Sequence, residues 1–172
     1  MAASELPTAA VLSRETLYIT RGANDGGGDR LSYELRPSGS LIVTHSYIDP
    51  RSSPERVKSS ETVQIPAEVA SPFRALMWRV RPARLEGQGL EKDEVRPAGC
   101  ERQGPHDFGE LAVAFIDEGK ATGIEDDRAG LFELPWSESC NTPAATEARR
   151  VVWQALRLLP PSKTTASFER TR

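Results

Sequence analysis

Reactive side chains are scarce in this sequence of 172 residues, which holds only two histidines and two cysteines. His45, His106, Cys100 and Cys140 stand at spacings that match no recognised metal site or catalytic motif. Most acid–base, metal and nucleophilic chemistry uses imidazole or thiolate groups that partners hold in place. We therefore expect a protein that is not an enzyme, binds no metal or cofactor, and acts by binding a partner.

Long hydrophobic runs are also missing. The longest uninterrupted apolar run, Leu111–Ile116, is far too short to span a bilayer. Glu5 stands where a secretory signal needs positive charge. We expect a cytoplasmic protein without membrane contact, whose Cys100 and Cys140 are reduced thiols. A disulfide between these two cysteines is the less favoured alternative.

The chain has no excess of positive charge. Its formal net charge is −3, which argues against general nucleic-acid binding because that function needs a basic face. The charge is uneven, since residues 109–138 sum to −6 and the rest to +3. Part of this acidic segment forms a candidate docking surface for a basic partner: Asp117, Glu118, Glu125, Asp126 and Asp127. The spacing of these acidic residues does not match that of a calcium-binding loop. The alternative to a docking surface is a turn that is exposed to solvent.

Alternating hydrophobicity predicts a series of strands. The first four expected strands are 15–21, 31–35, 41–48 and 61–65, and later ones are 110–117, 121–124 and 130–134. Pro37 and Gly39 predict a tight hairpin turn between the second and third strands. A Pro/Ser-rich loop is expected over 49–56. A long Gly-, Pro- and charge-rich loop is expected over 83–107.

Helical spacing predicts two helices. The first is expected over 66–81, either as one helix or as one turn followed by a helix that Ser71 caps and Pro72 begins. The second is expected to be capped by Thr142, to begin at Pro143 and to end before Pro160. Its predicted buried stripe is Ala144, Ala148, Val151, Ala155 and Leu158.

The order ββββ-α-ββ(β)-α predicts an α+β fold. We expect an antiparallel sheet of about six strands with two helices packed mainly on one face. Residues 15–160 would form a single domain of ordinary size. Residues 1–14 are expected to be a flexible lead-in and residues 161–172 a flexible tail, in which Phe168 is a docking candidate.

Two tryptophans give the more specific hint of a binding surface. The predicted stripe leaves Trp153 on the outer side of its helix, with Arg149 and Arg157 one turn to either side. Trp78 has the same arrangement, with Arg74 and Arg81 beside it. Exposed Trp and Arg dominate binding hot spots. The alternative is that the 83–107 loop or the tail covers each ring, with arginine stems packed across it.

One group of residues supports a different function. Cys100, His106 and Asp107 are the only thiol–imidazole–carboxylate grouping close together in the sequence, which allows a small cysteine-dependent hydrolase or transferase. His45 is instead expected to be a sheet histidine bonded to a neighbour. A structural homodimer that pairs its sheet edges or its Trp-bearing helices is a third reading.

We therefore expect a cytoplasmic protein-binding or inhibitor module, monomeric or homodimeric. It would neutralise a basic toxin or enzyme by occluding its active site, as small bacterial immunity proteins do. This is an analogy of type, because no motif in the sequence matches a family.

Overall fold

The computed structural model describes residues 15–22, 27–49, 51–81, 111–117 and 142–171. Within them the chain forms an α+β fold with a five-stranded sheet and three helices. The strands are β1 (Glu15–Gly22), β2 (Gly28–Leu35), β3 (Ser40–Asp49), β4 (Ser52–Gln64) and β5 (Leu111–Asp117). The helices are α2 (Ala67–Trp78), α3 (Pro143–Leu156) and α4 (Lys163–Glu169). The predicted fold class is confirmed, while the predicted six strands and two helices are not matched; the strands expected at 121–124 and 130–134 lie outside the described residues.

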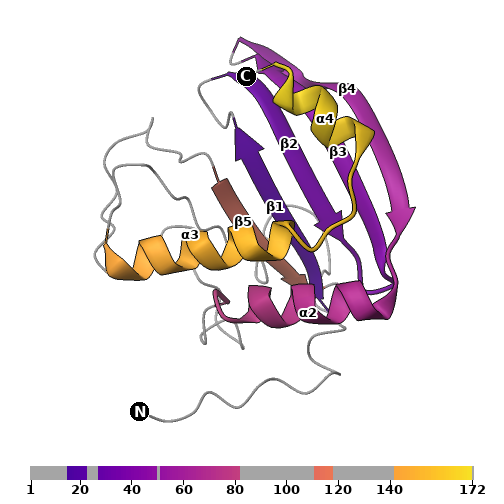
Figure 1. Cartoon of the computed structure of the whole chain (residues 1–172). Coiled ribbons are helices and arrows are strands. Elements are labelled where there is room, and N and C mark those ends of the chain that lie inside the picture. Colours follow the sequence, from indigo (N-terminus) through magenta and orange to yellow (C-terminus); the bar gives the residue numbers. More distant parts are fainter. Residues whose placement is uncertain (1–14, 23–26, 50, 82–110, 118–141, 172) are drawn as a thin grey trace.

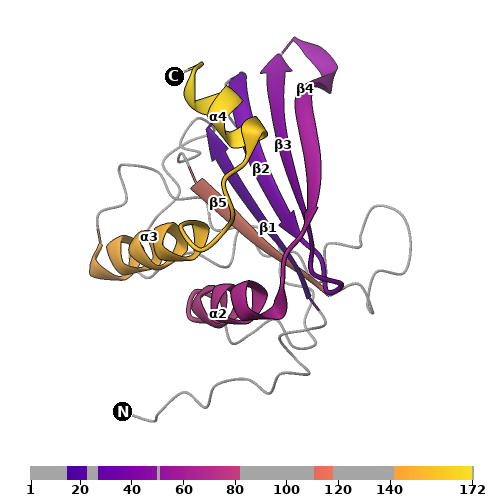
Figure 2. The same cartoon turned by 45° about the vertical axis from the view of Figure 1, so that its right-hand side comes forward.

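The sheet is antiparallel throughout, in the order β4-β3-β2-β1-β5. The first four strands form the predicted meander, and β5 joins it beside β1. The three helices lie on one face of this sheet (Figures 1 and 2). The core lies between the helices and that face, where Leu17, Ile19 and Val43 meet Phe73 and Val152. The prediction of helices on one face is therefore confirmed, with α4 added to them.

The turn between β2 and β3 forms as predicted. Gly39 has a φ of 83°, and its N–H donates to the carbonyl of Arg36 over 3.0 Å. The positive φ favours glycine here, and a Cβ at position 39 would also lie 3.2 Å from the carbonyl oxygen of Ile65. The turn fixes the register in which Leu35 faces Leu41.

The loop predicted over 49–56 is wrong, because most of this segment is strand. β4 begins at Ser52, and Asp49 faces Ser52 across a tight connection. The composition is typical of a loop, but β4 is an edge strand, and an edge tolerates proline since its outer N–H groups need no partner. Two register shifts, at His45/Ser46 and at Tyr47/Asp49, accompany this irregular half of the β3–β4 hairpin.

Helix α2 confirms the first of the two predictions for this segment, that of one continuous helix. It begins at Ala67 with Pro66 as its N-cap, so Pro72 lies inside the helix rather than opening it. The helix ends at Trp78 and continues as a turn in which Arg81 N–H donates to the carbonyl of Trp78.

Helix α3 begins as predicted, with the Thr142 hydroxyl accepting from the N–H of Ala145 and Pro143 at the first position. Its predicted stripe is only partly right: the buried residues are Ala145, Val151, Val152 and Ala155. Ala144 and Leu158, which were expected inside, are exposed. The sequence carries the doublets Ala144-Ala145, Val151-Val152 and Leu158-Leu159, so the apolar spacing alone cannot set the rotation of the helix.

The end of the chain is not the loose tail that the sequence indicated. Residues 163–169 form helix α4, and the Ser162 hydroxyl caps it by accepting from the N–H of Thr165 over 3.0 Å. Phe168, 1% exposed, docks in the core and makes an edge contact with the ring of His45. This one aromatic anchor and the cap explain why so polar a segment is ordered.

Candidate functional site

The predicted acidic surface falls mostly outside the described residues. Asp117 ends the edge strand β5, where it faces Glu15 of β1. Glu118, Glu125, Asp126 and Asp127 are not described, and neither is the group Cys100, His106 and Asp107. Both readings therefore stay predictions.

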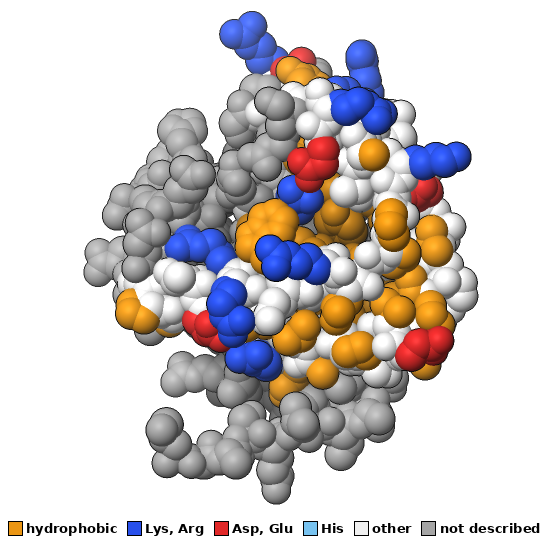
Figure 3. All heavy atoms as spheres, in the orientation of Figure 1, with side chains coloured by type: hydrophobic (Ala, Val, Ile, Leu, Met, Phe, Trp, Pro, Cys, Tyr) orange, Lys and Arg blue, Asp and Glu red, His pale blue; other side chains and the backbone are white. Residues whose placement is uncertain are grey.

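The side chain of Trp153 is half-buried and not fully exposed to solvent. Its ring packs against the core, and the guanidinium carbon of Arg21 lies 4.6 Å from the ring centroid. Arg21 belongs to β1. The side chain over this ring therefore comes from neither the 83–107 loop nor the C-terminal tail, the two segments that the sequence suggested. Arg149 of α3 is half-buried, and Arg157, the C-cap of this helix, is exposed. Figure 3 shows Lys and Arg side chains gathered over α3.

Trp78 is also half-buried, and the guanidinium carbon of Arg81 lies 4.7 Å from its ring centroid. Arg81 in turn binds the buried carboxylate of Glu15 through Nε at 2.7 Å and through Nη2. The guanidinium of Arg81 thus lies over the ring. The 83–107 loop, which the alternative expected to cover it, lies outside the described residues. Trp153 thus joins α3 to β1 through Arg21, whereas Trp78 contacts Arg81 of its own segment. Both rings are half-buried, and their role in binding a partner stays a prediction.

Arg74, expected beside Trp78 on the outer side of α2, is 7% exposed. Its Nη1 donates to the carbonyl of Glu15 at 2.6 Å, and its Nη2 donates to that of Arg36 at 2.8 Å. Burial lowers the pKa of Arg74 and the charge of Glu15 acts in the opposite direction. Arg74 therefore ties α2 to the ends of β1 and β2, a role that no sequence pattern indicated.

His45 confirms the expectation of a sheet histidine with bonded neighbours. The ring is fully buried, with Nε2 2.6 Å from Oδ1 of Asp29 and Nδ1 3.3 Å from Oγ of Ser167. Desolvation acts to raise the pKa of Asp29, but the hydrogen bonds from Lys58 and His45 outweigh it and lower that pKa. An ionised carboxylate only accepts, so Nε2 carries the proton. The hydrogen bonds of His45 with Ser167 and with Asp29 therefore connect α4 to β3 and β2.

The outer edge of β4 is a second candidate for a binding surface. In the described part of the sheet, β4 has β3 on one side and no strand on the other. Two of the three exposed large hydrophobic residues in the described segments, Tyr47 and Val57, belong to this β3–β4 hairpin. The N-terminal half of β4 is protected against strand pairing by Pro54, Lys58 and the register shifts.

The C-terminal half of β4, Ser59–Gln64, has no proline, lysine or register shift, and we call it the open edge. It pairs with β3 without a shift from His45↔Ser59 to Ser40↔Gln64. The next residue, Ile65, donates its N–H to the carbonyl of Gly39 over 3.0 Å. Because inward and outward backbone groups alternate along an antiparallel strand, Ser60, Thr62 and Gln64 turn their N–H and C=O groups away from β3.

One side chain of the open edge is unusual. Glu61 stands on the core face of the sheet opposite Val43, in the same row as Tyr33. Its Oε1 is buried and has no hydrogen-bond partner, and the neighbouring Ser59 Oγ has none either. A buried acceptor without a donor costs free energy, on the order of 1–3 kcal/mol. Glu61 is the one charged residue of the open edge, and it stands on the same face as Val63.

Other kinds of site are not evident in the described residues. They contain no group of three or more His, Cys, Asp or Glu side chains placed to hold a metal ion. None of the helices described is long and apolar enough to cross a membrane. No protein-family model matches the chain, and no curated protein matches it.

Proposed function

We propose that the protein is a protein-binding module that adds a strand of its partner to the open edge of β4. The observation that carries this proposal is the regular run of outward backbone groups at Ser60, Thr62 and Gln64, which no described strand pairs with. Natural proteins limit strand addition at long sheet edges with prolines, bulges and charges. Of these, the open edge has only the charge of Glu61, which would restrict the added strand to one that suits a carboxylate. An extended partner segment would satisfy the outward backbone groups and extend the sheet.

The position of Glu61 favours a partner strand that carries a basic residue. Its own N–H and C=O point to β3, so an added strand would meet it at a position without inter-strand hydrogen bonds, where facing side chains lie closest. A Lys or Arg there would give the Oε1 atom of Glu61 the donor that it lacks. Opposite charges facing each other across strands contribute roughly 0.2–1 kcal/mol. The open edge is therefore suited to a strand with a basic residue opposite Glu61.

The finer proposal is an inhibitor that acts in the cytoplasm and blocks a basic toxin or enzyme, as bacterial immunity proteins do. The acidic segment that follows β5 in the sequence would add favourable long-range charge to the approach of such a partner.

The test uses three forms of the full chain as bait in an extract of the source cells: wild type, Thr62→Pro and Thr62→Val. Proline removes one outward N–H and leaves the ladder to β3 intact, whereas valine keeps that N–H. Wild type and Thr62→Val should retain the same stoichiometric protein, and Thr62→Pro should lose it. Glu61→Lys should lose it as well.

Hydrogen exchange in the isolated complex supplies the decisive measurement. The amides of Ser60, Thr62 and Gln64 should exchange rapidly in the free protein and slowly in the complex, while those of Ser59, Glu61 and Val63 are slow in both. Unprotected outward amides in the complex, or no partner at all, would refute the proposal. A homodimer that protects the same amides would replace the foreign partner by a second copy.

A further inference from the structure

Two neighbouring side chains of the open edge carry polar atoms that nothing in the described structure satisfies. Among the described residues, three buried side-chain nitrogen or oxygen atoms lack a hydrogen-bond partner, and two of these are Ser59 Oγ and Glu61 Oε1. The third, Nε of Arg21, belongs to β1. Buried polar groups are almost always paired in folded proteins. Two unpaired oxygens on one edge strand therefore point to a donor that comes from outside the chain.

Both side chains lie on the face of the sheet that carries the helices. Ser59 faces His45 and Glu61 faces Val43 across the β3–β4 ladder, and these two β3 side chains are buried. Residues two places apart on a strand lie about 6.5 Å apart on one face. Each of the two residues is half-buried, so a group that lies beside the edge can reach it. The two oxygens thus form a single site for a donor, which we call the acceptor pair.

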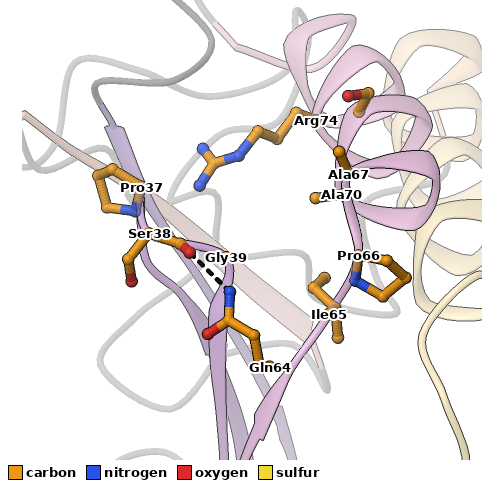
Figure 4. Close-up of a pocket in the computed structure, with 10 residues that line it drawn as sticks. Pro37, Ser38, Gly39, Gln64, Ile65, Pro66, Ala67, Ala70 and Arg74 are labelled. Atoms are coloured by element: carbon orange, nitrogen blue, oxygen red, sulfur yellow. Dashed lines mark hydrogen bonds between the residues drawn. The ribbon is translucent and has the colours of Figure 1, made fainter.

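The C-terminal end of the open edge is held in place by the neighbouring turn. Gln64 Nε2 donates to the carbonyl of Ser38 over 2.7 Å, which ties the end of β4 to the β2–β3 turn (Figure 4). Beyond Gln64 the chain leaves the sheet and enters α2. Within the open edge, the side chains on the helix-bearing face are therefore those of Ser59, Glu61 and Val63. An added strand meets these three positions on that face and no others.

The guanidinium of an arginine suits the acceptor pair better than the ammonium of a lysine. It is planar and carries five N–H donors, so it can donate to two separate oxygens at once. It is also more weakly hydrated than an ammonium group, and it therefore enters a partly buried site at a smaller loss of hydration. Its hydrogen bonds to a carboxylate are charge-assisted and stronger than those between neutral groups.

We infer that the open edge selects a partner strand with an arginine opposite Glu61, whose guanidinium donates to Glu61 Oε1 and to Ser59 Oγ. This inference rests on the strand addition proposed above and names the chemistry of the partner. In an antiparallel strand, the residue two places before the arginine faces Val63, which packs against the core, and is apolar. The residue two places after the arginine faces Ser59 and is small, because the guanidinium needs room to reach the hydroxyl. The partner strand therefore reads apolar-x-Arg-x-small.

The test uses three synthetic peptides that differ at one position. The parent is acetyl-Thr-Val-Thr-Arg-Thr-Ala-Thr-amide, and lysine or citrulline replaces the arginine in the other two. Citrulline keeps the shape of arginine but has a neutral urea in place of the guanidinium. Titration of the ¹⁵N-labelled full chain, followed through the backbone amide shifts of the open edge, gives the affinities. The arginine peptide should bind about tenfold more tightly than the citrulline peptide and about threefold more tightly than the lysine peptide.

Variants of the chain locate the preference. Ser59→Ala should weaken the binding of the arginine peptide about threefold, because one acceptor is lost. Glu61→Gln should remove the preference for arginine over citrulline. Thr44→Val, which removes a hydroxyl from the opposite face of the sheet, should change neither result. Thr62→Pro should weaken the binding of all three peptides, because it removes an outward N–H.

The outcomes separate this inference from the proposed function. If all three peptides bind equally and protect the outward amides of the open edge, strand addition stands and the arginine site is wrong. If Thr62→Pro loses a partner that the wild type captures, but no peptide binds at millimolar concentration, the arginine motif is wrong and strand addition again stands. A preference for arginine that survives both Glu61→Gln and Ser59→Ala places the guanidinium elsewhere and overturns the inference. If neither a peptide nor a partner binds, both proposals are refuted.

Discussion

The guanidinium of Arg21 lies over the ring of Trp153 and joins the sheet to α3. The same group lies 5.5 Å from the ring centroid of Phe168, and its Nη2 donates to Oε1 of Glu169 over 2.8 Å. Arg21 therefore contacts both C-terminal helices from one position on β1. Trp153, which the sequence offered as a binding residue, is part of this structural contact.

We expect Arg21→Met to lower the free energy of unfolding by about 1 kcal/mol, since it removes two cation–π contacts and one ion pair. Acrylamide should quench tryptophan fluorescence more efficiently in this variant because the Trp153 ring loses its cover. Urea denaturation and quenching measure the two effects. Arg157→Met, at an exposed position of the same region, should change neither appreciably. Equal effects of the two variants would contradict this role of Arg21.

Helix α3 shows what the spacing of apolar residues in the sequence can predict and what it cannot. Its cap, its first residue and its amphipathic character followed from local rules for Thr142 and Pro143. Its rotation did not, because each apolar doublet allows two phases that differ by one residue. The phase is set by tertiary packing of Val152 and Ala155 into the core, and it brings Trp153 inward with them.

His45→Ala should lower the free energy of unfolding by about 2–4 kcal/mol. The substitution opens a cavity next to Phe168 and leaves Asp29 and Ser167 without their shared partner. Ser167→Ala removes only the longer of the two hydrogen bonds of the ring and should cost about 1 kcal/mol or less. Urea denaturation of both variants gives the comparison. Similar losses would show that the ring itself contributes little.

The Asp29 carboxylate should make stability depend on pH in the acid range. Its pKa in the folded protein is lowered from 3.8, so its contribution is complete above that value and is lost as the pH falls further through the folded pKa. In Asp29→Asn the free energy of unfolding should therefore fall less steeply than in the wild type below about pH 4. Glu147→Gln is the control, because Glu147 has a lowered pKa too but sits in exposed ion pairs that solvent screens. Parallel curves for wild type and Asp29→Asn would contradict this.

The Ser162 cap of helix α4 was not predicted from the sequence and can be tested directly. Ser162→Ala should cost about 1 kcal/mol, because the N–H of Thr165 loses its acceptor. Amide exchange within 163–169 should accelerate in this variant before the sheet amides are affected. Ser38→Ala, in the β2–β3 turn, serves as the comparison and should leave exchange in α4 unchanged. Uniform acceleration throughout the protein would instead indicate global destabilisation.

The open edge could be predicted only in part. The alternation in residues 61–65 correctly indicated a strand, and it placed Glu61 on the same face as Val63 and Ile65. A carboxylate in an apolar row was the available signal of a special role. The sequence could not predict that β4 is an edge strand, because the strand order depends on where β5 joins the sheet. Arg74 was missed for the same reason, since its acceptors are carbonyl groups of residues distant in sequence.

Glu61 should favour binding at the expense of stability. Glu61→Leu removes the buried, unpartnered Oε1 and adds an apolar group beside Val43, so the free energy of unfolding should rise by about 1 kcal/mol or more. The same variant should bind the basic partner less tightly, because the group that a Lys or Arg would meet is gone. Glu61→Gln keeps the size and an acceptor but loses the charge, and should fall between the two in both measurements. Urea denaturation and partner titration on the three proteins decide the matter, since a stabilised variant that binds as tightly as the wild type would remove Glu61 from the interface.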